Sequence, residues 1–215
     1  MRILTLLALG GLLAPSVVAG QTPDTAANSM PEAEARAWAF TAAAYTYLLQ
    51  DDPDYLQATV TADRDALHLE GRYNYEAIHA ASTWLGYNLA AKGTVALAFT
   101  PIVGGVFGSL AGVGLGYEGS LSWKRLELYS ESEYVIDIDD SSGNFFYNWS
   151  QLIYEPAGWV NFGLVTQRTR LVDTDRDISP GPFLGFSYKS VDLTAFAFNV
   201  GADDAYLIVG IDVAF

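Results

Sequence analysis

The sequence lacks cysteine altogether and has little positive charge. Without cysteine, the chain forms no disulfide bond and has no thiol to which the lipid of a lipoprotein could be attached. It has 11 lysine and arginine residues against 25 aspartates and glutamates, and its net charge is −14. Because so acidic a chain repels phosphate groups, we exclude nucleic acid as a partner.

Long apolar runs are also scarce. The first one, from Ile3 to Ala14, follows Arg2 and is too short to span a bilayer as a helix. It ends before the small-residue segment Val17-Val18-Ala19-Gly20, which is the pattern of a secretory signal peptide. We therefore predict a signal peptide over residues 1–20, cleaved near Ala19 or Gly20, and a periplasmic N-terminal lead-in over residues 21–36.

Residues 93–117 carry no charge and are numerous enough for one membrane helix, which is an alternative to consider. The stretch contains Pro101 and many glycines, however, and glycine and proline are seldom so dense in a membrane helix. Its apolar residues alternate at Val95, Leu97 and Phe99. The pattern favours two strands, with a glycine-rich bend near Gly105 to Gly108.

Apolar residues are plentiful, at 51% of the chain, and they recur at every second position. Between residues 67 and 76, for example, Leu67, Leu69 and Tyr73 alternate with His68, Glu70 and Arg72. This period places successive side chains on opposite faces of a strand. It predicts strands near residues 37–48, 55–63, 66–76, 81–90, 94–104, 111–123, 126–137, 145–155, 159–169, 182–189, 191–201 and 205–215.

These segments indicate an all-β, antiparallel, up-and-down β-barrel of about 12 strands over residues 37–215, with 10 or 14 strands as alternatives. A soluble sandwich or a lipocalin-like barrel would also alternate, but the export signal favours a transmembrane barrel. The predicted connections agree, because the longest ones, residues 138–144 and 170–181, fall on one side, opposite short turns such as Asp63-Arg64-Asp65. Aromatic residues near strand ends are expected to form interfacial girdles: Trp38, Tyr55, Tyr75, Trp123, Phe145, Tyr147 and Trp159.

The last strand ends in Phe215, with apolar residues at alternate positions before it. This segment resembles the C-terminal strand of bacterial outer-membrane β-barrel proteins, a porin-like class. The resemblance implies a bacterial outer-membrane location, contact with outer-membrane lipid and lipopolysaccharide, and recognition by the barrel assembly machinery. The implied assembly signal comprises Leu207, Val209, Gly210, Ile211, Val213 and Phe215.

In a membrane barrel, the polar face of each strand lines the lumen. Candidate lumen-lining residues are His68, Glu70, Arg72, Asn74, Glu76, Glu118, Glu127, Glu131, Glu133, Asp192 and Asp212. An open lumen with this acidic lining would favour cations. If Trp84, Phe146, Tyr154 and Phe183 point inward, they narrow or block it.

No residue set stands out as catalytic, and no cofactor is expected. A membrane phospholipase of this class has a serine two residues after its histidine, followed by an asparagine. His79 and Ser82 are three residues apart and depart from that spacing. Asp173, Asp175 and Asp177 alternate as in a calcium loop, but the loop's central glycine and distal glutamate are missing, so they make a weak metal site. Divalent cations are possible partners of the acidic outer loops.

We therefore expect a narrow channel for small or cationic solutes. Two alternatives are a closed barrel with a structural or surface-interaction role, and a barrel enzyme acting on lipid or peptide.

Overall fold

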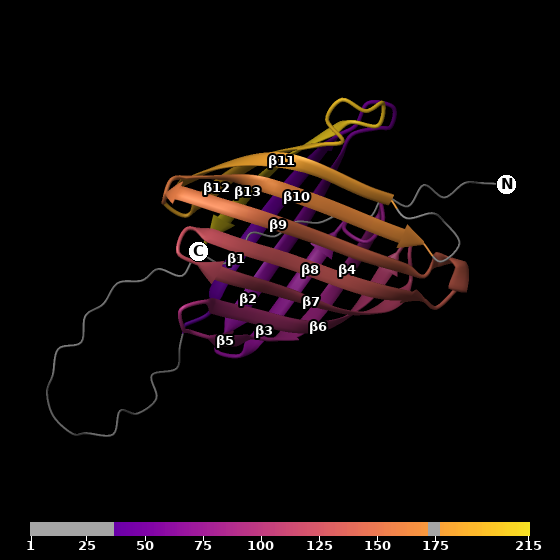
Figure 1. The fold of residues 1–215 in the computed structure, drawn as a ribbon. Coiled ribbons are helices and arrows are strands. Elements are labelled where there is room, and N and C mark those ends of the chain that lie inside the picture. Colours follow the sequence, from indigo (N-terminus) through magenta and orange to yellow (C-terminus); the bar gives the residue numbers. More distant parts are fainter. Residues whose placement is uncertain (1–36, 172–176) are drawn as a thin grey trace, which may run out of the picture.

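The computed structural model describes residues 37–171 and 177–215, which form a closed antiparallel barrel (Figure 1). Strands that follow each other in sequence pair, except that β4 and β5 both pair with β6, and the first strand pairs with the last over Thr41↔Ala214 to Leu48↔Leu207. The strands are β1 (Ala39–Leu48), β2 (Tyr55–Arg64), β3 (Leu67–Tyr73), β4 (Ala80–Tyr87), β5 (Leu89–Ala91), β6 (Ala96–Gly108), β7 (Gly112–Trp123), β8 (Leu126–Asp137), β9 (Phe145–Ala157), β10 (Val160–Leu171), β11 (Asp177–Tyr188), β12 (Val191–Phe198) and β13 (Tyr206–Ala214).

The two short strands β4 and β5 occupy one position in the wall, because both pair with β6. The wall therefore has the 12 strand positions that the alternation predicts. The predicted strand 81–90 is interrupted at Asn88, whose backbone N–H donates to Ala66 O at 2.7 Å. Its side-chain amide donates to Asp63 at 2.7 Å, which holds this break in place.

The uncharged stretch forms the hairpin β6–β7 and not a helix. Within the described part of the chain, no helix is long and apolar enough to span a membrane. The bend predicted at Gly105 to Gly108 is wrong, since these residues continue β6 and the turn follows at residues 109–111. Gly104 and Gly114 lie under the Trp84 indole, so the glycines serve close packing here: a Cβ on either residue would lie 2.4 or 2.3 Å from it.

The outer surface of the barrel is largely apolar. Val60, Leu115 and Leu164 are each more than half exposed, and similar residues recur on every long strand. Such a surface suits the hydrocarbon of a bilayer. Polar side chains interrupt it on β8 and β9, where Asn148 donates to Ser130 Oγ at 3.1 Å and accepts from Ser150 Oγ at 3.1 Å.

Two kinds of connection lie at opposite ends of the barrel. The C-terminus and β5 share one end in Figure 1, together with short turns such as the one between β7 and β8. The connection from β8 to β9, which contains the 3₁₀-helix η1 (Ser141–Gly143), lies at the other end. The connection from β10 to β11 is shorter than predicted, because the strands extend to Leu171 and from Asp177.

The predicted aromatic girdle is only partly right. Trp38, Trp123 and Trp159 are exposed on the outside. Tyr75, Phe145 and Tyr147 are instead buried in the interior, and Tyr55 stacks on the interior ring of Tyr47 at 4.6 Å. The prediction is wrong for Tyr75, Phe145 and Tyr147, because proximity to a strand end does not decide which face of the wall a side chain occupies.

Candidate functional site

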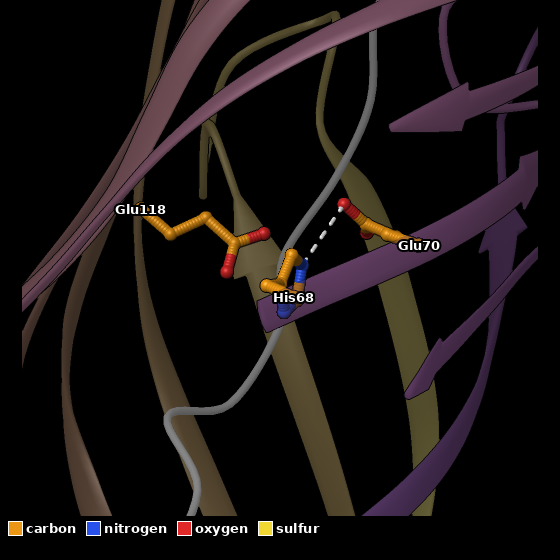
Figure 2. Close-up of side chains that lie close together, drawn as sticks. All are labelled: His68, Glu70 and Glu118. Atoms are coloured by element: carbon orange, nitrogen blue, oxygen red, sulfur yellow. Dashed lines mark ion pairs between the residues drawn. The ribbon is translucent and has the colours of Figure 1, made fainter. Parts of the chain in front are cut away.

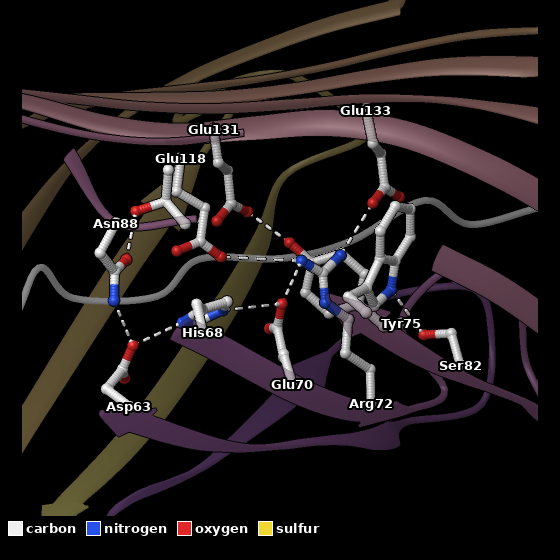
Figure 3. Close-up of polar contacts among 12 residues, drawn as sticks. Asp63, His68, Glu70, Arg72, Tyr75, Ser82, Asn88, Glu118, Glu131 and Glu133 are labelled. Carbon is white, nitrogen blue, oxygen red and sulfur yellow. Dashed lines mark hydrogen bonds and ion pairs between the residues drawn. The ribbon is translucent and has the colours of Figure 1, made fainter. Parts of the chain in front are cut away.

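Arg72 on β3 lies at the centre of a cluster of acidic side chains inside the barrel (Figure 3). Its guanidinium donates to Glu70 Oε2 at 2.7 Å and to Glu133 Oε2 at 2.8 Å. Glu76 and Glu118 are each 3.7 Å away. The guanidinium also lies 4.0 Å from the centre of the Tyr75 ring, a cation–π contact.

The cluster continues along β3 toward the tight turn of the hairpin β2–β3. His68 Nδ1 lies 2.8 Å from Asp63 Oδ1, its cross-strand partner. The same oxygen accepts from the Asn88 amide at 2.7 Å, and Asn88 in turn accepts from Thr100 Oγ1 at 2.7 Å. Since an ionised carboxylate only accepts, the proton between His68 and Asp63 belongs to the imidazole Nδ1.

Glutamates from the opposite wall complete the cluster. Glu131 on β8 accepts from the hydroxyls of Tyr75 and, at 2.8 Å, Tyr129. Glu118 on β7 and Glu133 on β8 reach toward Arg72 from the same side (Figure 3). The described side chains around the guanidinium, Glu131 and Glu133 among them, leave no gap large enough for a water molecule.

The connection between β3 and β4 folds inward and supplies two of the predicted residues. The strand predicted over 66–76 ends early, at Tyr73, because Asn74 has a φ of 56°, in the left-handed region. Asn74 donates to Leu56 O and accepts from the His79 N–H, both at 2.8 Å. The chain is thereby turned so that Glu76 is buried.

Glu76 accepts hydrogen bonds from Ser82 at 2.5 Å and from the Trp84 indole at 3.1 Å. Burial raises the pKa of its carboxyl above the usual range, and Arg72 with the two hydrogen bonds opposes that rise. Ser82 is thus engaged inside the barrel, whereas His79 is exposed. The two residues considered as a hydrolytic pair point into different environments.

Aromatic side chains fill another part of the interior. Trp149 on β9 packs edge-on against Phe196 at 5.2 Å and Phe198 at 5.4 Å, and all three are almost completely buried. Of the four aromatic residues that would narrow the lumen, Trp84 and Phe183 point inward. Phe146 and Tyr154 do not: they alternate with the inward residues of β9 and lie on the outer face.

The remaining predicted residues lie apart from the cluster. Glu127 is half-buried and accepts from Ser122 Oγ at 2.7 Å. Asp192 and Asp212 are cross-strand partners, and the buried Asp212 accepts from the Tyr45 hydroxyl at 3.0 Å. Asp173 and Asp175 lie outside the described residues, as does the side chain of Asp177. The proposed assembly residues Leu207, Val209 and Ile211 point outward on β13, Gly210 faces Tyr45, Val213 is half-buried and Phe215 is exposed.

Several residues of the cluster were not predicted from the sequence, chiefly Asp63, Tyr75 and Tyr129. Asp63 was assigned to a turn, although the register of a tight hairpin would have placed it opposite His68. The tyrosines carry no such signal, since their inward position depends on the register of distant strands.

No protein-family model matches the chain, and no curated protein matches it in sequence. Among solved structures, it is similar to a KdgM porin, with a TM-score of 0.60 and 12% identity over 81% of this chain and 99% of the porin. A structure described as KdgM porin in complex with disordered oligogalacturonate gives a TM-score of 0.59 and 12% identity over the same shares. The likeness confirms the predicted fold, a closed antiparallel barrel of the kind seen in these porins.

Proposed function

We propose that the chain is an outer-membrane channel for small solutes, with a narrow lumen that prefers cations. One observation carries this proposal: five glutamates surround a single arginine inside a barrel whose outside is apolar. Acidic groups lining a confined passage attract cations and repel anions. The likeness to porins favours a channel over an enzyme.

The charge of the interior also indicates the class of solute. The neighbouring porin is described in complex with oligogalacturonate, which carries many carboxylates. In this chain, Glu118, Glu131 and Glu133 face the interior and would repel such a polyanion. A different solute class, small cations, fits the charge of this lumen.

A closed barrel with a structural or surface-interaction role is the second candidate. The packing of Trp149, Phe196 and Phe198 favours it, because these fully buried rings occupy the interior. A closed barrel would show no conductance at any voltage.

Planar-bilayer recording on the refolded protein tests the channel. We expect a small conductance, and in a salt gradient a reversal potential of the sign given by cation preference. Conductance with anion preference would contradict the role of the acidic lining, and its complete absence would favour the closed barrel.

A charge-neutral variant of the lining sharpens this test. We expect Glu131→Gln to move the reversal potential toward zero, because it removes a charge from the lumen. The glutamine carbonyl still accepts from one of the hydroxyls of Tyr75 and Tyr129, and its NH2 group donates to the oxygen of the other. Asp203→Asn removes the same charge from an exposed connection and serves as the control. Equal shifts in the two variants would show that overall charge, and not the lumen, sets selectivity.

The proposed setting includes lipid and the assembly machinery. Outer-membrane lipid would cover the apolar outer surface, and Phe215 would serve in recognition by the assembly machinery. Divalent cations would bridge acidic connections, such as the one with Asp139 and Asp140, to the phosphates of lipopolysaccharide.

A further inference from the structure

We propose that His68, Glu70 and Glu118 bind a divalent transition-metal ion, with zinc the best match, inside the barrel. His68 and Glu70 come from β3 and Glu118 from β7, on the other side of the interior (Figure 2). One possible ligand atom from each residue lies within 4.8 Å of the other two. Ligand atoms around a tetrahedral zinc are about 3.3 Å apart at bond lengths of about 2.0 Å, so small side-chain rotations suffice.

The imidazole of His68 is oriented as a metal ligand requires. Its Nδ1–H donates to Asp63 at 2.8 Å, so Nε2 is the nitrogen that binds a metal ion, with release of any proton that it carries. Nε2 is buried and has no hydrogen-bond partner, and Glu70 Oε2 lies 3.8 Å away. A carboxylate that fixes the far nitrogen of a histidine is the usual support of a metal-binding imidazole.

The two carboxylates also keep free oxygens. Arg72 binds Glu70 through Oε2, while Glu70 Oε1 is buried without a hydrogen bond. Glu118 Oε1 likewise lacks a hydrogen bond, and its nearest cation is Arg72 at 3.7 Å. Glu70 Oε2, which Arg72 orients, is the oxygen that lies 3.8 Å from His68 Nε2, and Oε1 of the same carboxylate remains available to the proposed ion.

The charge of the surroundings favours a bound cation. Carboxyl groups outnumber basic side chains in the cluster. The basic partners are Arg72 and His68, and the carboxyl groups are those of Asp63, Glu70, Glu76, Glu118, Glu131 and Glu133. Burying carboxylates without enough positive charge is unfavourable. A divalent ion between Glu70 and Glu118 offsets part of that excess.

The donor set selects the type of metal. One imidazole nitrogen and two carboxylate oxygens, with a position left for water, match zinc. Calcium takes six to eight oxygen ligands, more than this trio supplies. The side chain of Glu118 is 17% exposed, which leaves a route for the ion to enter.

Metal binding is tested on the refolded, EDTA-treated barrel by titration calorimetry with zinc chloride. We expect one zinc ion per chain, and no comparable binding of calcium. His68→Gln and Glu118→Gln should abolish binding, and Asp63→Asn should weaken it about 10- to 100-fold, as loss of an outer-shell partner does. His79→Gln, which removes the exposed histidine, should bind as the unaltered protein does.

Copper(II) in place of zinc adds a spectroscopic readout. Its electron paramagnetic resonance spectrum should show coupling to one imidazole nitrogen, lost in His68→Gln and kept in His79→Gln. Absence of zinc binding, or binding that survives His68→Gln, would overturn the proposal. Heat-modifiable gel migration of each variant shows that the barrel is folded. Glu118→Gln changes the least buried of the three ligands, so it tests the site even if the other variants misfold.

This experiment is independent of the proposed channel. Zinc binding without conductance would support the metal site and contradict the channel. Conductance without zinc binding would support the channel and contradict the metal site.

Discussion

At the scale of single residues, Arg72 holds the interior together. It is 2% exposed and forms close ion pairs with Glu70 on its own strand and Glu133 on the opposite wall. A buried ion pair adds little net stability compared with apolar packing, but removing one partner leaves the other charge uncompensated. The acidic cluster therefore makes this arginine hard to replace.

Arg72→Met should lower the free energy of unfolding by about 3–5 kcal/mol, because Glu70 and Glu133 would remain buried without their cation. Urea titration of the barrel refolded in lipid vesicles, followed by tryptophan fluorescence, measures the loss. Arg168→Met is the control, since Arg168 lies over Phe146 on the outer face of the barrel, away from the acidic cluster. We expect that variant to be as stable as the unaltered protein or slightly more stable. Equal losses in both would refute the special role of Arg72.

At the scale of elements, β4, β6 and β7 depend on glycine for their close approach. Gly104 and Gly114 are cross-strand partners, and the Trp84 indole of β4 lies across both. The indole reaches this position to donate to Glu76 at 3.1 Å. These glycines thus couple the barrel wall to the acidic cluster.

Gly114→Ala should destabilise the barrel by about 1–3 kcal/mol, because its Cβ would lie 2.3 Å from a Trp84 ring carbon and force the indole to move. Gly105→Ala offers a matched control on the adjacent strand, with nothing within 4 Å of the added Cβ. Near-ultraviolet circular dichroism and the urea midpoint report the displacement. If both variants behave alike, Trp84 does not pack on Gly114.

At the scale of the whole molecule, closure joins the first strand to the last. Phe215 follows β13 and is 79% exposed, although its backbone N–H donates to Phe40 O at 2.9 Å. So exposed a ring adds little to folded stability, and its proposed use lies in assembly.

Phe215→Ala should leave the unfolding free energy of the purified barrel within about 0.5 kcal/mol of the original, since surface changes of this kind are nearly neutral. In cells, however, the fraction of chain that reaches the heat-modifiable, membrane-inserted form should fall. Val200→Ala removes another exposed apolar side chain, in a connection, and should assemble normally. Normal assembly of Phe215→Ala would remove the residue from the assembly signal.

The sequence by itself determined the class of fold and the faces of the strands. Alternation with a period of two is local, so it placed His68, Glu70 and Arg72 on one face and Leu67 and Leu69 on the other without any knowledge of the partners. Tight turns such as Lys124-Arg125 follow from the same local pattern.

Only the tertiary structure decided which inward side chains meet. Glu118 and His68 lie on strands that do not pair, so their approach depends on the closure and stagger of the whole barrel. The inward fold of Glu76 depends on Asn74, whose left-handed conformation is stabilised by Leu56 of another strand. The sequence determined an acidic interior because strand alternation is local, whereas the chemistry at Arg72 and His68 comes from contacts across the lumen that no local pattern encodes.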